Sequence, residues 1–263
     1  TVAKIGHVTN FLSDATTGPE LVERWQLALD ATSCELIRDH AEELTPIGDG
    51  WRVRLRSGTE INAGYVLVVA GNRWVRLDEH PLIAGVAEGI DVIDFWPNEY
   101  RSILDADQPL IVGSDRPLGT FVLTIADEWD IEASAWPQVL VLPDKAHALS
   151  DVPADMELDL LWADSINAIR RDGSGYVVEY QKDGVKAHVR ASDLIANLGT
   201  RPNNELLAGF TTVDDAGYAT GNLPTRLLIA GDLAQPSHRR IATAVGEGAH
   251  AVLTAYYESE GLL

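Results

Sequence analysis

The sequence predicts an α/β fold, and two observations support this prediction. Between about Trp74 and Asn197, apolar runs typical of buried strands alternate with a short helical pattern. Nearer the C-terminus, an apolar run over residues 226–230 breaks at Gly231-Asp232 and leads into a segment rich in alanine and glycine. A buried strand that ends in Gly-Asp before such a helix brings a carboxylate and a helix N-terminus to one place.

The first part of the chain predicts one helix and two strands. Apolar residues recur at helical spacing over residues 20–31, after a turn at Thr17-Gly18-Pro19 that places proline near the first helical turn. Alternation over residues 51–55 predicts a strand, and the apolar run over residues 64–70 predicts a buried one.

The middle of the chain predicts a further α/β unit. Residues 109–113 and 139–142 are expected strands, and residues 120–127 are an expected short helix. Residues 176–180 alternate as one half of a β-hairpin would.

Composition excludes several classes of function. With 46% hydrophobic and 23% charged residues, the 263-residue chain is expected to be globular. Its 40 acidic and 20 basic residues give a net charge of -20, which disfavours binding to nucleic acids and anionic membranes. No apolar run approaches the roughly 18 residues of a membrane span, and Thr1-Val2-Ala3-Lys4 leads into no signal-peptide core, so we expect a cytoplasmic protein. The seven histidines lack metal-ligand spacing, and no metal is expected.

Four segments resemble, in the same order, the low-molecular-weight thioredoxin reductases and their relatives. The densest begins at Ala230, reads AGDLAQPSHRRIATAVGEGAHAVLTAYY, and is similar to their C-terminal flavin-binding segment. The others are Thr9-Asn10-Phe11 with residues 17–21, then residues 68–71, and then residues 198–203.

The resemblance implies a fold with two dinucleotide-binding domains. Residues 1–75 and 199–263 would form a discontinuous FAD-like domain, and residues 76–198 a degenerate NAD(P)-binding-like domain. The opening βαβ unit of the family, with its Gly-x-Gly-x-x-Gly turn, is missing from this sequence, and with it half of the dinucleotide site. Either the sequence is a fragment whose first strands were removed or belong to another polypeptide, or the protein no longer binds FAD in the inherited way.

The resemblance also implies an FAD site. Asp232 would bind the ribityl hydroxyls, and the Ile241 N–H would face the pyrimidine carbonyl of the flavin. Arg239 and Arg240 would flank the ring, although relatives carry glutamine at the position of Arg240, and Asn10 would reach the ring from the other side. The other implied positions are Ala70 and Gly71, at a turn that crosses the cofactor, and Gly231, His238 and Ala242 in the C-terminal segment. The structural alternative is that Asp232 caps a helix and the arginines form a solvated pair.

Two departures from the family concern electron transfer. Cys34 is the single cysteine, so the dithiol that passes electrons from flavin to partner cannot form within the chain, and we expect Cys34 to be an inert small apolar residue. The turn after the strand at residues 109–113 keeps only its first glycine, because Asp115 replaces the second and Leu118 fills the helix-packing position. NADPH binding at the usual place is therefore predicted to be lost.

Two further segments have structural and functional interpretations. Trp96 or Tyr100 could stack on a planar ligand, but we favour a space-filling role for this aromatic segment. Gly246 and Gly248 lie inside the expected C-terminal helix, where each costs roughly 1 kcal/mol relative to alanine, which predicts that another group approaches closely.

The resemblance and its departures lead to one functional hypothesis and two alternatives. We expect a thioredoxin reductase-like FAD-dependent oxidoreductase, acting as a homodimer, that exchanges electrons directly with a redox protein or a small molecule. One alternative is a non-catalytic paralogue with a structural or regulatory binding role. The other is a ferredoxin-NADP reductase-like flavoenzyme, which lacks the cysteine pair naturally but needs the nucleotide turn that Asp115 interrupts.

Overall fold

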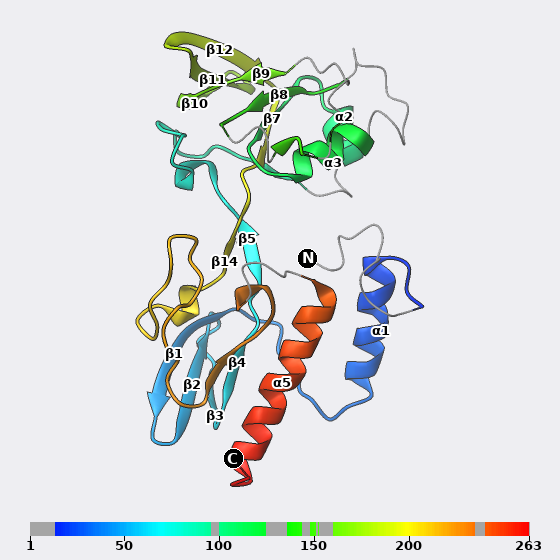
Figure 1. Ribbon diagram of the computed structural model, residues 1–263, viewed down its shortest axis with the longest axis vertical. Helices are drawn as coiled ribbons and strands as arrows, with labels where there is room; N and C mark the ends of the chain where they lie inside the picture. Colours follow the sequence, from blue (N-terminus) through cyan, green and yellow to red (C-terminus); the bar gives the residue numbers. More distant parts are fainter. Residues whose placement is uncertain are drawn as a thin grey trace. The chain divides into compact units, whose positions relative to one another are not determined.

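The computed structural model describes residues 14–95, 100–124, 136–143, 148–150, 152, 160–234 and 240–262. The chain divides into two compact units (Figure 1). Unit 1 comprises Thr1–Arg73 and Arg201–Leu263, and unit 2 comprises Trp74–Thr200. Among the described residues, no helix combines the length and the apolar composition that a membrane crossing requires.

Unit 1 begins with a helix whose start is fixed by its cap. Thr17 Oγ1 accepts a hydrogen bond from the Glu20 N–H at 3.4 Å, and Glu20 Oε2 accepts one from the Thr17 N–H at 3.3 Å. This capping box satisfies two N–H groups that have no intrahelical acceptor. The helix, α1, spans Gly18–Asp30 and confirms the helix expected at residues 20–31.

The rest of unit 1 is an antiparallel three-stranded sheet, a short parallel sheet and a long C-terminal helix (Figure 1). A core of Leu44, Trp51, Val68, Leu227 and their neighbours joins the two sheets. The elements are β1 (Ala41–Ile47), β2 (Gly50–Leu55), β3 (Glu60–Ala63), β4 (Val66–Val68), η6 (Glu205–Leu207), β15 (Leu227–Ile229), η7 (Gly231–Leu233) and α5 (Ile241–Ser259).

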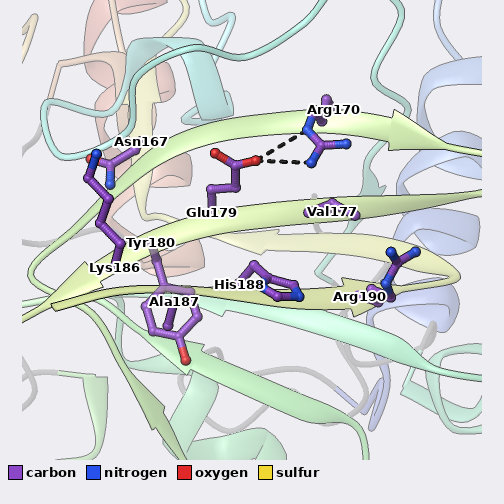
Figure 2. A pocket seen from close by; sticks show the side chains of 9 residues that line it. All are labelled: Asn167, Arg170, Val177, Glu179, Tyr180, Lys186, Ala187, His188 and Arg190. Atoms are coloured by element: carbon purple, nitrogen blue, oxygen red, sulfur yellow. Dashed lines mark hydrogen bonds and ion pairs between the residues drawn. The ribbon is translucent and has the colours of Figure 1, made fainter.

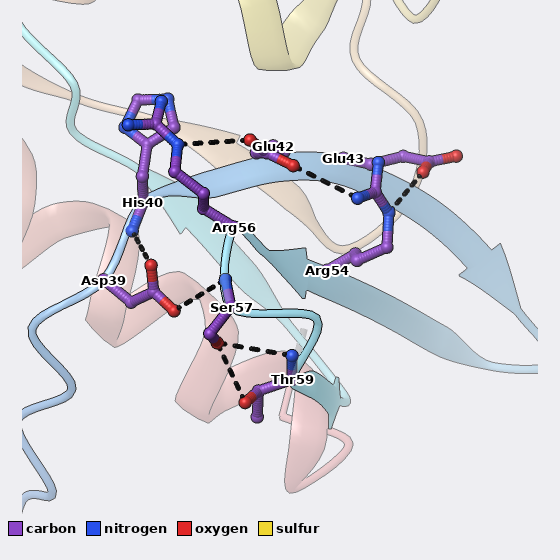
Figure 3. A network of polar contacts seen from close by, with 8 residues as sticks. All are labelled: Asp39, His40, Glu42, Glu43, Arg54, Arg56, Ser57 and Thr59. Atoms are coloured by element: carbon purple, nitrogen blue, oxygen red, sulfur yellow. Dashed lines mark hydrogen bonds and ion pairs between the residues drawn. The ribbon is translucent and has the colours of Figure 1, made fainter.

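A polar network follows the exposed face of β1 and β2 (Figure 3). The Arg54 guanidinium contacts Glu43 at 2.9 Å and Glu42 at 3.1 Å, and Arg56 contacts Glu42 at 3.2 Å. Asp39 accepts hydrogen bonds from the N–H groups of Ser57 and His40, and bonds from these two residues lower the pKa of its carboxyl. Because these pairs are exposed, the network adds little to the stability of the sheet.

Unit 2 is built on a parallel sheet with the strand order β6-β13-β7-β8-β9. Side chains alternate along each strand, so Leu110 and Val112 face one core while Ile111 faces another. Both faces are buried, which explains why residues 109–113 read as a continuous apolar run. The strands are β6 (Ile93–Asp94), β7 (Pro109–Gly113), β8 (Gln138–Val141), β9 (Leu161–Trp162) and β13 (Asp193–Asn197).

Helices and an antiparallel sheet cover the two faces of this parallel sheet. The helices α2 (Tyr100–Asp105) and α3 (Pro117–Leu123) contribute Ile103, Leu118 and Phe121 to one core. On the other side, β10 (Ser165–Asp172), β11 (Gly175–Lys182) and β12 (Val185–Ala191) form an antiparallel meander that contributes Ile169, Val178 and Val189. The remaining elements are η2 (Leu77–Glu79), β5 (Asn72–Trp74) and β14 (Thr200–Pro202), of which β5 and β14 pair with each other.

The α/β class is confirmed, while several element boundaries differ from the prediction. The strand expected over residues 64–70 is limited to β4, Val66–Val68. The helix expected at 120–127 starts three residues earlier, because Pro117 supplies a preset helical φ at its first turn. Residues 176–180 form half of a hairpin, as predicted, and β11 pairs on both sides, so they lie in the middle strand of a three-stranded meander.

Candidate functional site

The candidate site lies in unit 1, where two parallel strands end side by side. Leu227 pairs with Val66 and Ile229 with Val68, so β15 and β4 run in the same direction. Their carboxyl ends therefore meet at one edge of the sheet. The chain continues into Gly231-Asp232 after β15 and into Ala70-Gly71 after β4. Ligands bind characteristically at this edge of open α/β sheets.

The Gly231-Asp232 turn is fixed against α5. Gly231 has a φ of 72°, a conformation that glycine adopts without strain. A Cβ at this position would lie 3.5 Å from the Cβ of Ala244, which shows how closely the helix passes. The Gly231 N–H donates a hydrogen bond to Glu247 Oε2 at 2.7 Å. Ala244 and Glu247 are one helical turn apart, so a single face of α5 holds the turn.

The Ala70-Gly71 turn is fixed by Asn203. The Asn203 N–H donates to the Gly71 carbonyl at 2.9 Å, and Asn203 Nδ2 donates to the Ala70 carbonyl at 2.9 Å. Gly71 also has a positive φ, 63°, and no described atom lies within 4 Å of where its Cβ would be. The backbone of this turn is therefore open to a ligand. Asn203 is a site residue that motif reading did not assign, although it lies in a segment that resembles the family.

The helix α5 begins beside these turns. Arg240 is its N-cap, with extended φ and ψ of -134° and 150°, and its side chain makes no cap hydrogen bond. Ile241 is 9% exposed, whereas Ala242 is exposed. The first N–H groups of a helix lack intrahelical acceptors and carry partial positive charge. They favour carbonyl or anionic oxygens of a ligand.

The predicted site residues therefore separate into two groups. Ala70, Gly71, Gly231 and Asp232 lie at the ends of two adjacent strands, and Arg240, Ile241 and Ala242 begin the helix that contacts the Gly231-Asp232 turn. Asn10, His238 and Arg239 lie outside the described residues. Asp232 is half-buried, so its carboxylate can accept hydrogen bonds at the edge of the sheet.

The second expected nucleotide turn, in unit 2, is closed by side chains. Leu118 is fully buried, and its Cδ2 atom lies 2.8 Å from where a Cβ of Gly113 would be. The carbonyl of Asp115 accepts a hydrogen bond from Asn197 Nδ2 at 3.0 Å. The helix that follows, α3, has seven residues. The first glycine is therefore needed to accommodate Leu118, a role in packing.

A histidine lies next to this turn. His80 Nε2 is 3.5 Å from Ser114 Oγ, and the Leu82 N–H donates to His80 Nδ1 at 3.3 Å. Burial lowers the pKa of His80 from its ordinary value of 6.5. A ring that accepts at Nδ1 is neutral, with its proton on Nε2.

Other candidates from the sequence lie elsewhere or play structural roles. Cys34 is exposed, and its inert character stays a prediction. Phe95 is buried and packs on Phe121 with ring centroids 5.5 Å apart. Trp96 and the side chain of Tyr100 lie outside the described residues, so their space-filling role stays a prediction. No described atom lies within 4 Å of a Cβ at Gly246 or Gly248, so the expected close approach is absent from the described chain. In the same residues, no group of three or more His, Cys, Asp or Glu could hold a metal ion.

Comparisons with known proteins agree with this architecture. No protein-family model matches the chain. A thioredoxin reductase from Streptomyces clavuligerus is 25% identical over 264 residues, covering 94% of this chain and 79% of that protein. A second, from Streptomyces coelicolor, is 24% identical with the same coverage. The chain is thioredoxin reductase-like.

Solved structures of thioredoxin reductases share the fold. The crystal structure of the Lactococcus lactis enzyme matches with a TM-score of 0.71 at 18% identity, over 97% of this chain and 86% of that one. The T. acidophilum enzyme matches with a TM-score of 0.66 at 15% identity, over 98% and 86%. At these identities the structures establish the thioredoxin reductase-like fold, and the activity is a separate question.

Proposed function

We propose that this thioredoxin reductase-like chain is an FAD-dependent oxidoreductase that exchanges electrons directly with a partner redox protein or a small molecule. The observation that carries the proposal is the meeting of Gly231-Asp232, Ala70-Gly71 and the start of α5 at one sheet edge. FAD supplies the capacity to accept and donate electrons when it is bound. The protein supplies a carboxylate, open backbone groups and a helix N-terminus.

Each part of the site has a defined role in this proposal. The Asp232 carboxylate accepts hydrogen bonds from the ribityl hydroxyls, and the Ile241 N–H donates to the pyrimidine carbonyl. The Arg240 cation and the helix dipole favour negative charge on the reduced ring. Gly71 leaves room for the cofactor, since no described atom occupies the space beside it. Asn10, His238 and Arg239 remain proposed contacts that lie outside the described residues.

The proposal has two further parts: the chain uses no dithiol relay, and it does not bind NADPH at the usual turn. A single cysteine cannot close an intramolecular disulfide, and Cys34 is exposed in unit 1. In unit 2, Leu118 packs onto Gly113 where backbone N–H groups would otherwise approach a pyrophosphate. These features support electron exchange without a thiol relay. They also favour the second candidate, a non-catalytic paralogue that keeps the fold for binding, and they disfavour a ferredoxin-NADP reductase-like enzyme.

We also propose a cytoplasmic homodimer. Unpartnered apolar side chains on α5 support self-association: Val245, Val252, Leu253 and Tyr256 are all between 44% and 59% exposed.

Flavin binding is tested by purifying the chain and measuring visible absorbance after desalting and after incubation with FAD. We expect a yellow protein that dithionite bleaches under anaerobic conditions and NADPH does not. Bleaching by NADPH would refute the predicted loss of NADPH binding. A colourless protein that takes up no FAD would leave only the non-catalytic alternative.

The role of Asp232 is tested with a matched pair of variants. Asp232→Ala removes acceptors for ribityl hydroxyls, and because hydrogen bonds to charged groups contribute about 1.5–3 kcal/mol, FAD affinity should fall roughly tenfold or more. Asp215→Ala is the control, because Asp215 is exposed in a loop of the same unit. FAD titrations of both variants give the answer, and equal affinities would remove the assigned role of Asp232.

A further inference from the structure

The meander of unit 2 has a polar face opposite its core face. Register places Arg170 and Arg190 on either side of Val177, in one row across the three strands. The next row on the same face pairs Glu179 with His188, and Lys186 lies two residues before His188 on β12. The alternate positions, Ile169, Val178 and Val189, face the core.

The three strands that form this face carry, with their turns, a local excess of positive charge in an acidic protein. Residues 165–191 contain five of the 20 Lys and Arg residues of the chain and three of its 40 Asp and Glu residues, a local net charge of +2. The whole chain has a net charge of -20. At 0.1 M salt, charges interact over roughly 10 Å, so a ligand on this face responds mainly to the local excess.

The polar face is hollowed into a shallow groove. The groove has a volume of about 290 Å³ and is lined by the two arginines, Glu179, His188, Lys186 and Asn167. Figure 2 shows Lys186 and Asn167 at one end and the two arginines at the other. The floor includes Val177, which is 2% exposed because the stems of its arginine neighbours flank it. The volume of the groove is at the small end of the range for ligand pockets and suits side chains better than a dinucleotide.

The charges in the groove are available to a ligand. Arg170 contacts Glu179 at 3.0 Å and Arg190 pairs with Asp172, but all four side chains are at least 36% exposed. Exposed pairs of this kind are worth about 1 kcal/mol or less, so a competing carboxylate can replace them at small cost. The side chains of Lys186 and His188 make no hydrogen bond or ion pair with any described residue.

We propose that this groove binds an acidic, extended peptide segment of a protein partner. Lys186 and Arg190 are four residues apart on one strand, about 13 Å, which matches carboxylates four residues apart on an extended peptide. Between these two ends the floor of the groove is formed by the buried Val177. A nucleic acid fits less well, since it carries a charge about every 1.7 Å, whereas Lys186 and Arg190 offer cations about 13 Å apart.

Hexaglutamate labelled with a fluorophore is the probe, and hexaglutamine is its neutral counterpart. Fluorescence anisotropy in 50 mM salt should show binding of hexaglutamate only, weakening as salt is raised to 300 mM. Lys186→Glu should weaken binding roughly fivefold or more. Lys182→Glu is the matched control, with the same charge change on an exposed residue of the same sheet that does not line the groove, and it should change affinity less than twofold. His188→Ala is a second variant that leaves the fold undisturbed and should also weaken binding.

Several outcomes would overturn the proposal. These are no binding of hexaglutamate, equal binding of hexaglutamine, equal losses in Lys186→Glu and Lys182→Glu, or tighter binding of a single-stranded oligothymidine than of the peptide. The assay involves no flavin, so its result is independent of the proposed cofactor.

Discussion

At the scale of single residues, His80 shows how burial controls a charge. Its ring accepts a hydrogen bond from the Leu82 N–H and lies beside Ser114, at the closed turn after β7. Burial disfavours the protonated ring and so lowers the pKa of His80. Protonation at Nδ1 would also remove the acceptor for Leu82. The folded chain therefore holds this histidine neutral.

The pH dependence of stability follows from this shift. Since the unfolded chain binds the proton more readily, the contribution of His80 is complete above pH 6.5, its ordinary pKa, and is lost as the pH falls below that value. We expect the free energy of unfolding in urea to fall between pH 7.5 and pH 5.5, and to fall less in His80→Gln than in the unaltered protein. His188→Gln is the control, because His188 is exposed. If the free energy of unfolding falls equally between the two pH values in His80→Gln and in the unaltered protein, this assignment is wrong.

At the scale of elements, α5 serves the candidate site through only part of its surface. Ala244 and Glu247 hold the Gly231-Asp232 turn, and Ile241 and Ala251 are buried. Gly246 and Gly248 face no described neighbour. The two glycines therefore cost helix propensity without a packing reason in the described chain, unlike Gly231, whose positive φ requires glycine.

Alanine substitutions at these glycines should have opposite effects. Gly246→Ala should raise the free energy of unfolding by about 0.5–1 kcal/mol through helix propensity. Gly231→Ala should lower it by about 1–2 kcal/mol, because a side chain disfavours its left-handed backbone conformation. Chemical denaturation measures both. A destabilised Gly246→Ala variant would mean that another group, such as a second copy of the chain, packs on this face of α5.

At the scale of the whole molecule, the excess of negative charge is the dominant electrostatic feature. The net charge of -20 creates repulsion that acts throughout the surface. The opposing ion pairs, such as Arg54 with Glu43 and Arg170 with Glu179, are exposed and individually weak. Repulsion is therefore the larger effect, and screening it stabilises the folded chain.

Added salt should accordingly raise the melting temperature. Between 20 and 300 mM NaCl we expect a gain on the order of 1 kcal/mol, or roughly 2–4 °C for a chain of this size. Calorimetry or circular dichroism at neutral pH measures the shift. A melting temperature that falls with NaCl would mean that the surface ion pairs outweigh the repulsion.

The sequence by itself determined the α/β class, the buried strand at residues 109–113 and the strand, Gly-Asp and helix order after residue 226. These are local signals, because apolar periodicity and turn residues are written in consecutive positions. It also predicts that Asp115 and Leu118 obstruct a nucleotide, since that turn requires particular residues at fixed offsets.

Only the tertiary structure decided which distant residues meet. The bond from Gly231 to Glu247, the bridge from Asn203 to Ala70 and the row of Arg170, Val177 and Arg190 join positions from 7 to 133 residues apart. Strand register and helix contact create these groupings, and neither is encoded in the spacing of any one segment. The exposed position of Cys34 and the open space at Gly246 were settled in the same way, because burial depends on what the rest of the chain places nearby.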